Sequence, residues 1–151
     1  MYDRIVVPLD GSELANQALD AARELSRRLD VPLHLVRAID PTAINRVGSM
    51  GMGFDYTAID ELLKEEEQDA SNFIDELVKS LTAEGFKVSG VVLRGYAAAA
   101  ITASTEPGDL LVMASHGRTG VRRWFLGSVA EEVLRQSSVP VLLIRQPHVE
   151  E

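Results

Sequence analysis

The chain contains no cysteine among its 151 residues. A disulfide framework and a thiolate metal site are therefore excluded, and the composition fits an intracellular protein. The three histidines offer no substitute, because His34 lies in an apolar segment, His116 in a glycine-rich one and His148 near the chain end. The sequence thus gives no support for a histidine metal cluster.

Positive charge is also scarce. The chain has 15 lysines and arginines against 23 acidic residues, for a formal net charge of -8. This balance argues against sequence-independent binding to nucleic acid or to anionic lipid. We therefore expect small molecules or proteins as partners.

Long apolar runs are missing as well. No run approaches the roughly 20 residues that cross a membrane, and the opening MYDRIVVPLD lacks the basic and apolar regions of a signal peptide. We expect a soluble, cytoplasmic protein with no membrane-bound part.

What the sequence does contain is an alternation of short β-branched segments with segments of helical periodicity. The predicted strands are 4–9, 32–39, 87–94, 109–114 and 139–144, and the predicted helices are 14–29, 59–81, 97–104 and one that begins near Ser128. Nearly apolar strands joined by helical crossovers indicate a parallel sheet with both faces covered. We predict one α/β domain over 1–151, a doubly wound five-stranded parallel sheet sandwiched by helices, with ligands bound beyond the carboxyl ends of its strands.

Two segments stand apart from this alternation. The stretch from Asp40 to Ala58 is long for a connection and holds three glycines and two methionines, so it is either a functional lid or a segment without fixed structure. The charge run KEEEQD, from Lys64 to Asp69, is typical of a solvated helix face.

The segment LVMASHGRTGVRRWFLGSVAEEVLR, from Leu111 to Arg135, begins as a buried strand and ends as an amphipathic helix. Glycines, hydroxyls and arginines lie between the two. Unpaired N–H groups at a helix start and the helix dipole favour an anion, and glycine lets the backbone approach it closely. The spacing is neither a Walker A loop nor G-x-G-x-x-G, so the segment is either a phosphate cradle or a plain loop.

Together with both chain ends, this segment resembles the universal stress protein family. The residues that carry the resemblance are VPLDGSELANQAL after the first predicted strand and MASHGRTGVRRWFLGSVAEEVLRQSSVPVLLIR at the end, and it extends over essentially the full length. Nucleotide-binding members of that family have the motif G-x2-G-x9-G-[ST]. Its positions here are Ala114, Gly117, Gly127 and Ser128, so alanine replaces the first glycine and adds one methyl group. The implied fold is that of the adenine nucleotide alpha hydrolases.

The resemblance implies where a triphosphate would bind. Gly117 and Gly127 would line it, and the Ser128 hydroxyl with the N–H groups of Ser128 and Val129 would contact its oxygens. Ala114 would allow a slightly less close backbone contact than glycine does.

It also implies contacts to the nucleoside and to a metal. Asp10 would hold Mg²⁺ directly or through water, as magnesium prefers few protein ligands. Pro8, Leu9 and Ala38 would lie beside the adenine, and Gly95 where the ribose approaches.

Several of these residues have a second interpretation. Ser128 with Glu131 fits a capping box, in which the serine caps its helix, and Asp10 before Gly-Ser fits turn chemistry. A nucleophile made of Ser115 and His116 is not supported, because adjacent side chains at a strand end are expected to point apart and no third partner is evident.

The rest of the glycine-rich segment is also ambiguous. Arg118, Arg122 and Arg123 are either phosphate ligands or solvated side chains. Trp124 and Phe125 are more typical of packing residues than of an adenine platform.

The predicted function is that of an ATP-binding regulator in the stress response, implied by the resemblance, with a regulatory protein partner. The alternatives are a slow ATPase or phosphoryl-transfer enzyme, for which the glycine segment lacks a lysine, and a nucleotide-free dimeric interaction module. We also expect a homodimer through the apolar last strand, Val139 to Ile144, unless the tail RQPHVEE covers that edge.

Overall fold

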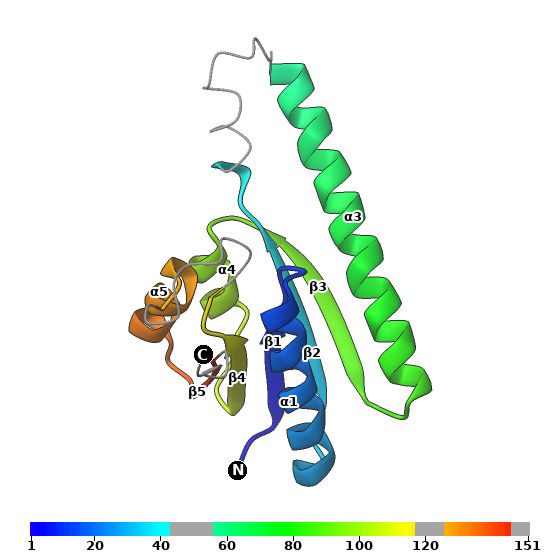
Figure 1. Cartoon of the computed structure of the whole chain (residues 1–151), viewed down its shortest axis with the longest axis vertical. Helices are drawn as coiled ribbons and strands as arrows, with labels where there is room; N and C mark the ends of the chain where they lie inside the picture. Colours follow the sequence, from blue (N-terminus) through cyan, green and yellow to red (C-terminus); the bar gives the residue numbers. More distant parts are fainter. Residues whose placement is uncertain (43–55, 117–125, 146–151) are drawn as a thin grey trace, which may run out of the picture.

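A computed structural model describes residues 1–42, 56–116 and 126–145. Five strands form a sheet in the order β3-β2-β1-β4-β5, and every pair of neighbours is parallel. The strands are β1 (Arg4–Pro8), β2 (Leu33–Ile39), β3 (Val88–Arg94), β4 (Asp109–Ala114) and β5 (Val141–Ile144). The predicted five-stranded parallel sheet is confirmed (Figure 1).

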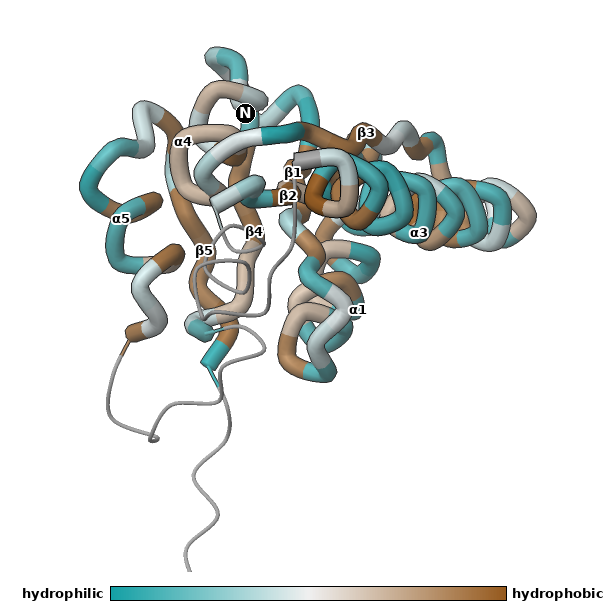
Figure 2. The backbone as a smooth tube through the Cα atoms, turned by 90° about the horizontal axis from the view of Figure 1, so that it is seen from above, coloured by the Kyte–Doolittle hydropathy of each residue, from teal (hydrophilic) through white to brown (hydrophobic). Residues whose placement is uncertain are grey.

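Helices cover both faces of the sheet. They are α1 (Glu13–Leu29), α3 (Tyr56–Ala83), α4 (Ala97–Ala103) and α5 (Ser128–Gln136). Residues of α1 and α3 pack with Ile5, Val7 and Leu35, whereas residues of α4 and α5 pack with Val6 and Val36. Successive strand residues therefore face opposite layers, as expected for a sheet buried on both sides. Figure 2 shows α1 and α3 on one side of the sheet and α4 and α5 on the other, which confirms the sandwich.

The central strand β1 lies where the chain changes direction across the sheet. The chain passes from β1 through α1 to β2 on one side, while β4 flanks β1 on the other. Connections that diverge from neighbouring parallel strands leave a crevice at their carboxyl ends. Pro8 ends β1 and Ala114 ends β4, so both residues lie at this crevice.

The last strand and the long helix α3 differ most from their predicted ranges, and the other boundaries differ by at most one residue. The last strand begins at Val141, because Pro140 has no N–H for the ladder, although its carbonyl accepts from the Leu111 N–H at 2.9 Å. The connection predicted over 40–58 is shorter at its end, since α3 already begins at Tyr56. Its residues 43–55 lie outside the described part, so its role as a lid stays a prediction.

The charge run 64–69 lies on α3, and most of its side chains are exposed, as predicted. One of them, Glu67, accepts a hydrogen bond from Arg94 of β3 and so helps to hold α3 against the sheet. No helix in the described ranges is both long and apolar enough to cross a membrane.

Candidate functional site

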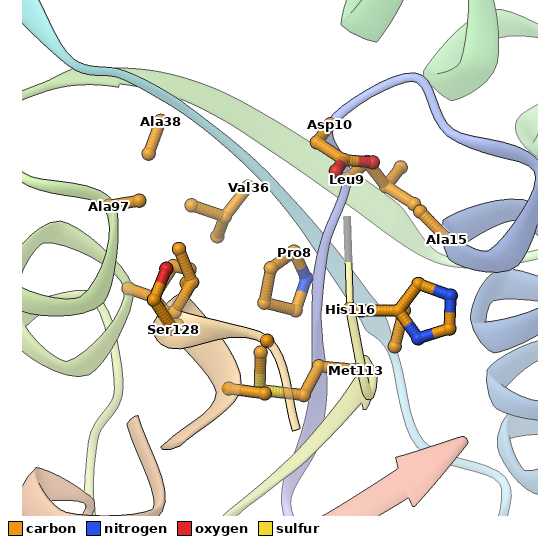
Figure 3. Close-up of a pocket in the computed structure, with 15 residues that line it drawn as sticks. Pro8, Leu9, Asp10, Ala15, Val36, Ala38, Ala97, Met113, His116 and Ser128 are labelled. Carbon is orange, nitrogen blue, oxygen red and sulfur yellow. The ribbon is translucent and has the colours of Figure 1, made fainter. Parts of the chain in front are cut away.

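A cavity of about 200 Å³ lies where β1, β2 and β4 end, beside the first turn of α5. Figure 3 shows Pro8 near the centre of the view, with Val36 and Ala38 of β2 to its upper left and Met113 of β4 below. A cavity is therefore present in the crevice that the strand connections predict.

The lining of the cavity is mostly apolar. Val36, Ile101 and Met113 supply large buried side chains to it. Among the described lining residues, polar side chains come from Asp10, His116 and Ser128 alone. A cavity with an apolar wall and a few polar groups suits a small molecule that has a flat apolar part and a polar end.

Eight of the ten residues predicted for the site line this cavity. They are Pro8, Leu9, Asp10, Ala38, Ala114, Gly127, Ser128 and Val129. Gly95 does not line it. Gly95 follows β3 with φ of +146°, and its N–H bonds the Ile39 carbonyl at 2.9 Å, so it is part of the turn out of β3.

The remaining predicted residue, Gly117, lies outside the described residues. So do the arginines and aromatic residues of the same segment: Arg118, Arg122, Arg123, Trp124 and Phe125. Their roles stay predictions.

Asp10 has a place in the turn from β1 to α1 as well as in the cavity. Its Oδ1 accepts the Ser12 N–H at 2.9 Å, and Gly11 between them has φ of +82°. Ser12 in turn caps α1, since its Oγ accepts the Ala15 N–H at 3.2 Å. The turn interpretation of Asp10 is confirmed, and it does not compete with a ligand role, because the carboxyl group also lines the cavity.

The capping box predicted for Ser128 and Glu131 is wrong. The N-cap of α5 is Gly127, whose extended backbone (φ −61°, ψ 154°) precedes the helix, and no side chain caps this end. The Glu131 N–H bonds the Gly127 carbonyl at 3.0 Å, while the Glu131 carboxylate accepts from Arg135 at 2.7 Å. The Ser128 hydroxyl is thus one residue too late to cap the helix, and it lines the cavity instead.

Gly127 makes an unusually close contact with the end of β4. Its N–H bonds the Ser115 carbonyl at 2.7 Å, and a Cβ added to it would lie 2.9 Å from the His116 Cα. No ordinary side chain fits at that distance. The glycine is therefore needed for packing between the start of α5 and residues 115–116, apart from any approach to phosphate.

Ser115 and His116 do not point apart as expected. The Ser115 Oγ lies 3.2 Å from Nδ1 of His116, within hydrogen-bonding distance. The prediction of diverging side chains was wrong, because it assumed strand geometry, whereas β4 ends at Ala114. Ser115 is 4% exposed and is not among the described residues that line the cavity, so the structure gives no support to a nucleophile there.

Residues that the sequence did not single out also line the cavity. Ala15, Ala97 and Ala130 come from three helices, and Val36 and Met113 from strands. In the sequence these residues cannot be told apart from other core residues. They can be identified as cavity residues only from the fold, which brings their helices and strands together at one place.

Comparison with known proteins gives the relatives of the chain. Residues 1–145 match the model of the universal stress protein family. The chain is 33% identical to Universal stress protein MJ0531 of Methanocaldococcus jannaschii over 152 aligned residues, which cover 99% of this chain and 86% of that one.

Solved structures share its fold. The structure of MJ0577, also a universal stress protein of M. jannaschii, superposes with a TM-score of 0.81 at 30% identity and covers 99% of both chains. The universal stress protein of Archaeoglobus fulgidus in complex with dAMP has a TM-score of 0.61 at 23% identity, over 95% of this chain and 98% of that one, and at this identity shows the fold alone.

Proposed function

The chain belongs to the universal stress protein family, and we propose that it binds ATP in the cavity at the ends of β1, β2 and β4 and acts as a nucleotide-dependent regulator. The observation that carries this proposal is the convergence of eight predicted residues, from separate parts of the sequence, on one cavity. The regulatory function would then depend on whether a nucleotide is bound and on a partner protein that distinguishes the bound from the empty state.

The adenine would occupy the apolar part of the cavity. Pro8, Leu9 and Ala38 would lie beside the ring, and Val36 and Met113 would pack against it. The cavity of about 200 Å³ suits a base better than a whole nucleotide, so the phosphates would extend toward the opening. The A. fulgidus relative, which shares the fold, was solved in complex with dAMP, an adenine nucleotide of the class that we propose for this chain.

The phosphates would lie at the start of α5. Ser128 is the first residue of this helix, and the N–H groups of its first turn have no partner within the helix. Together with the Ser128 hydroxyl and the helix dipole, they would bind phosphate oxygens. Gly117 would add a further backbone contact.

Asp10 would serve a magnesium ion that accompanies the phosphates. One of its oxygens already accepts the Ser12 N–H, which fixes the carboxyl group while it lines the cavity. The described residues contain no group of three or more histidines and carboxylates that could hold a metal by themselves. Magnesium would thus need the phosphate oxygens and water as its other ligands, as it commonly does.

Self-association through β5 is the second part of the proposal. Just before this strand Pro140 points its carbonyl toward β4, so by alternation the backbone groups of Val141 and Leu143 face outward. Leu142 is 39% exposed at the same edge. An antiparallel pairing of two copies about a two-fold axis would satisfy the edge and cover Leu142.

The proposal is tested by calorimetry with ATP on the unaltered protein and on two variants that each enlarge an alanine. Ala38→Leu should fill the adenine region and weaken ATP binding at least about tenfold, since the added side chain takes the volume of the base. Ala99→Leu, on the exposed side of α4, is the matched control and should bind as the unaltered protein does. Equal affinity of all three proteins, or no nucleotide in the purified protein and no binding on titration, would refute it.

A further inference from the structure

Strand β3 forms the edge of the sheet opposite β5, on the side of α3 (Figure 1). The Lys87 carbonyl accepts the Leu33 N–H at 2.9 Å, and the Gly95 N–H bonds the Ile39 carbonyl at 2.9 Å, so odd-numbered residues of this segment bond β2. Because the bonding side alternates along a strand, the N–H and C=O groups of the even-numbered residues face outward. These residues are Val88, Gly90, Val92 and Arg94. Their outward groups have no partner within the described part of the chain.

This edge lacks the features that usually keep another strand away. All seven residues of β3 pair with β2 one for one, so the strand has no bulge, and those before Arg94 include neither proline nor a charged residue. Ser89 and Gly90 are exposed, although the Ile74 side chain of α3 lies against Gly90 on one face. A long, regular and accessible edge of this kind is a template for a further strand.

The face of β3 that points away from α3 offers apolar contacts. Val91 and Leu93 pack beside the α4 and α5 core, yet both stay half-buried, because α4 lies mainly against β2. Two residues separate them along the strand, so both side chains lie on the same face. A strand added at this edge would place apolar side chains beside them at alternate positions.

The free charge at this edge comes from Lys87. Lys87 directly precedes β3, is exposed, and lies by alternation on the same face as Val91 and Leu93. Within the described ranges it has no ion-pair partner, whereas Arg94 at the other end of the strand bonds Glu67. In a chain of net charge -8, this cation favours an acidic residue in a strand that lies beside it.

From these features we propose that β3 binds an extended segment of a partner protein, which adds a strand to the sheet. The segment places apolar side chains beside Val91 and Leu93 and presents an acidic residue to Lys87. The inference goes beyond nucleotide binding and does not depend on it.

An extended segment fits this edge better than a folded partner or a second copy does. Stable interfaces between folded proteins bury roughly 1,200–2,000 Å² in total, which is large beside one strand edge with two half-buried apolar side chains. A second copy is disfavoured by the pairing proposed for β5. If both edges paired with their own kind, sheets would grow without limit.

The first test uses the unaltered protein alone. Amide hydrogen exchange followed by NMR should be fast at the outward N–H groups of Gly90 and Val92 and slow at the inward ones of Val91 and Leu93, which bond β2. Slow exchange of the outward groups at every protein concentration would mean that the chain covers its own edge. Slow exchange at high concentration alone would mean that a second copy does. Either result overturns the inference.

The second test adds a synthetic peptide with blocked ends, Glu-Thr-Val-Thr-Val-Thr-Glu, whose valines and glutamates share one face. At saturation it should slow exchange of the outward N–H groups of β3 at least about tenfold and leave those of β5 unchanged. The matched control has the same composition, Glu-Val-Val-Thr-Thr-Thr-Glu, but its valines lie on opposite faces, so it should bind more weakly. No protection by the first peptide, equal protection by both, or protection at β5 instead would overturn the inference.

A charge exchange tests the role of Lys87. Lys87→Glu should weaken binding of the first peptide by about three- to tenfold at low salt, and a peptide with lysines in place of its glutamates should restore binding. Lys64→Glu is the matched control, because Lys64 is exposed near the start of α3, at the opposite end of the helix from Lys87, and it should bind the first peptide as the unaltered protein does. If both variants bind both peptides alike, charge at this edge does not select the partner and the inference fails.

Discussion

Arg4 and Asp109 form a bidentate ion pair that joins β1 to β4 at the amino ends of the strands. The Arg4 Nε donates to Oδ1 at 2.9 Å and Nη2 donates to Oδ2 at 2.6 Å. Asp109 is 3% exposed, and its Oδ2 also accepts the Glu106 N–H at 2.8 Å. Burial opposes ionisation of the carboxyl, but the bonds from Arg4 and Glu106 outweigh it, so the pKa of Asp109 lies below its ordinary value. The sheet is thus held at the end opposite the cavity.

Asp109→Asn should lower the free energy of unfolding by about 2 kcal/mol near pH 7, because it leaves a partly buried Arg4 with only the more distant carboxylate of Glu106, at 3.9 Å, as a charged partner. Since the folded pKa lies below the unfolded one, the carboxylate stabilises the fold above a pH of about 4, and this contribution is lost as the pH falls further. Urea unfolding should show the largest difference between wild type and variant near pH 7 and a smaller one near pH 3.

The same comparison in a His34→Gln background removes a second contribution to the loss of stability at low pH. Burial first and the Arg4 charge second lower the pKa of His34, so its protonation also destabilises the folded state in acid. If the difference that Asp109→Asn makes in this background stayed constant from pH 7 to pH 3, the ionised pair would not be what stabilises the sheet.

Gly127→Ala should destabilise the protein by about 1–3 kcal/mol, because its Cβ would lie 2.9 Å from the His116 backbone. A Gly127→Ala protein as stable as wild type in a thermal scan would contradict the close contact. Gly127→Ala should also weaken ATP binding, so this variant cannot distinguish a phosphate contact from packing.

Ser128→Ala can distinguish them, because it removes only the hydroxyl. We expect unchanged thermal stability and an ATP affinity reduced by about three- to tenfold.

The sequence predicted the part of the site that the parallel topology brings together. Pro8 and Ala114 end neighbouring strands, so their meeting follows from the order of the elements alone. The contact between Gly127 and His116 could not be predicted, since it depends on how residues 115–116 leave the strand. The capping role predicted for Ser128 failed for a similar reason: the backbone conformation of Gly127 decides where α5 begins.

Asp10→Asn separates charge from turn geometry at the proposed metal position. The asparagine oxygen can still accept the Ser12 N–H, so the turn into α1 and the thermal stability should be retained. If the carboxylate serves magnesium, ATP affinity should fall by about tenfold with Mg²⁺ and change little, or rise slightly, with a chelator present. Calorimetry in both buffers checks this. Parallel losses in the two buffers would assign Asp10 to the nucleotide or the turn instead.

ATP turnover should be far below the ordinary enzyme range of roughly 1–1000 per second. The glycine segment has no lysine to accompany the transferred phosphate, and Ser115 is not among the described residues that line the cavity. Phosphate release measured over hours is the check. Sustained turnover in the enzyme range that Ala38→Leu abolishes would favour the enzyme over the regulator.

A charge placed at the outer edge of β5 should separate the proposed dimer. In an antiparallel pairing about a two-fold axis, Leu143 of the two copies would lie close together, and two lysines there would repel each other. Leu143→Lys is therefore expected to give a monomer by light scattering at tens of micromolar, where the unaltered protein gives a dimer. Leu143 also packs beside the α4 and α5 core, so its thermal stability must be measured in parallel.

Leu142→Lys is the variant that keeps this test decisive if the first one unfolds. Leu142 is 39% exposed, so a lysine there costs the isolated chain little, but it would be covered at the edge of a paired sheet. Leu62→Lys, equally exposed on α3 and away from β5, is the matched control and should remain dimeric. If the unaltered protein is a monomer at these concentrations, the proposed pairing fails, and the outward backbone groups of Val141 and Leu143 are satisfied by water or within one chain.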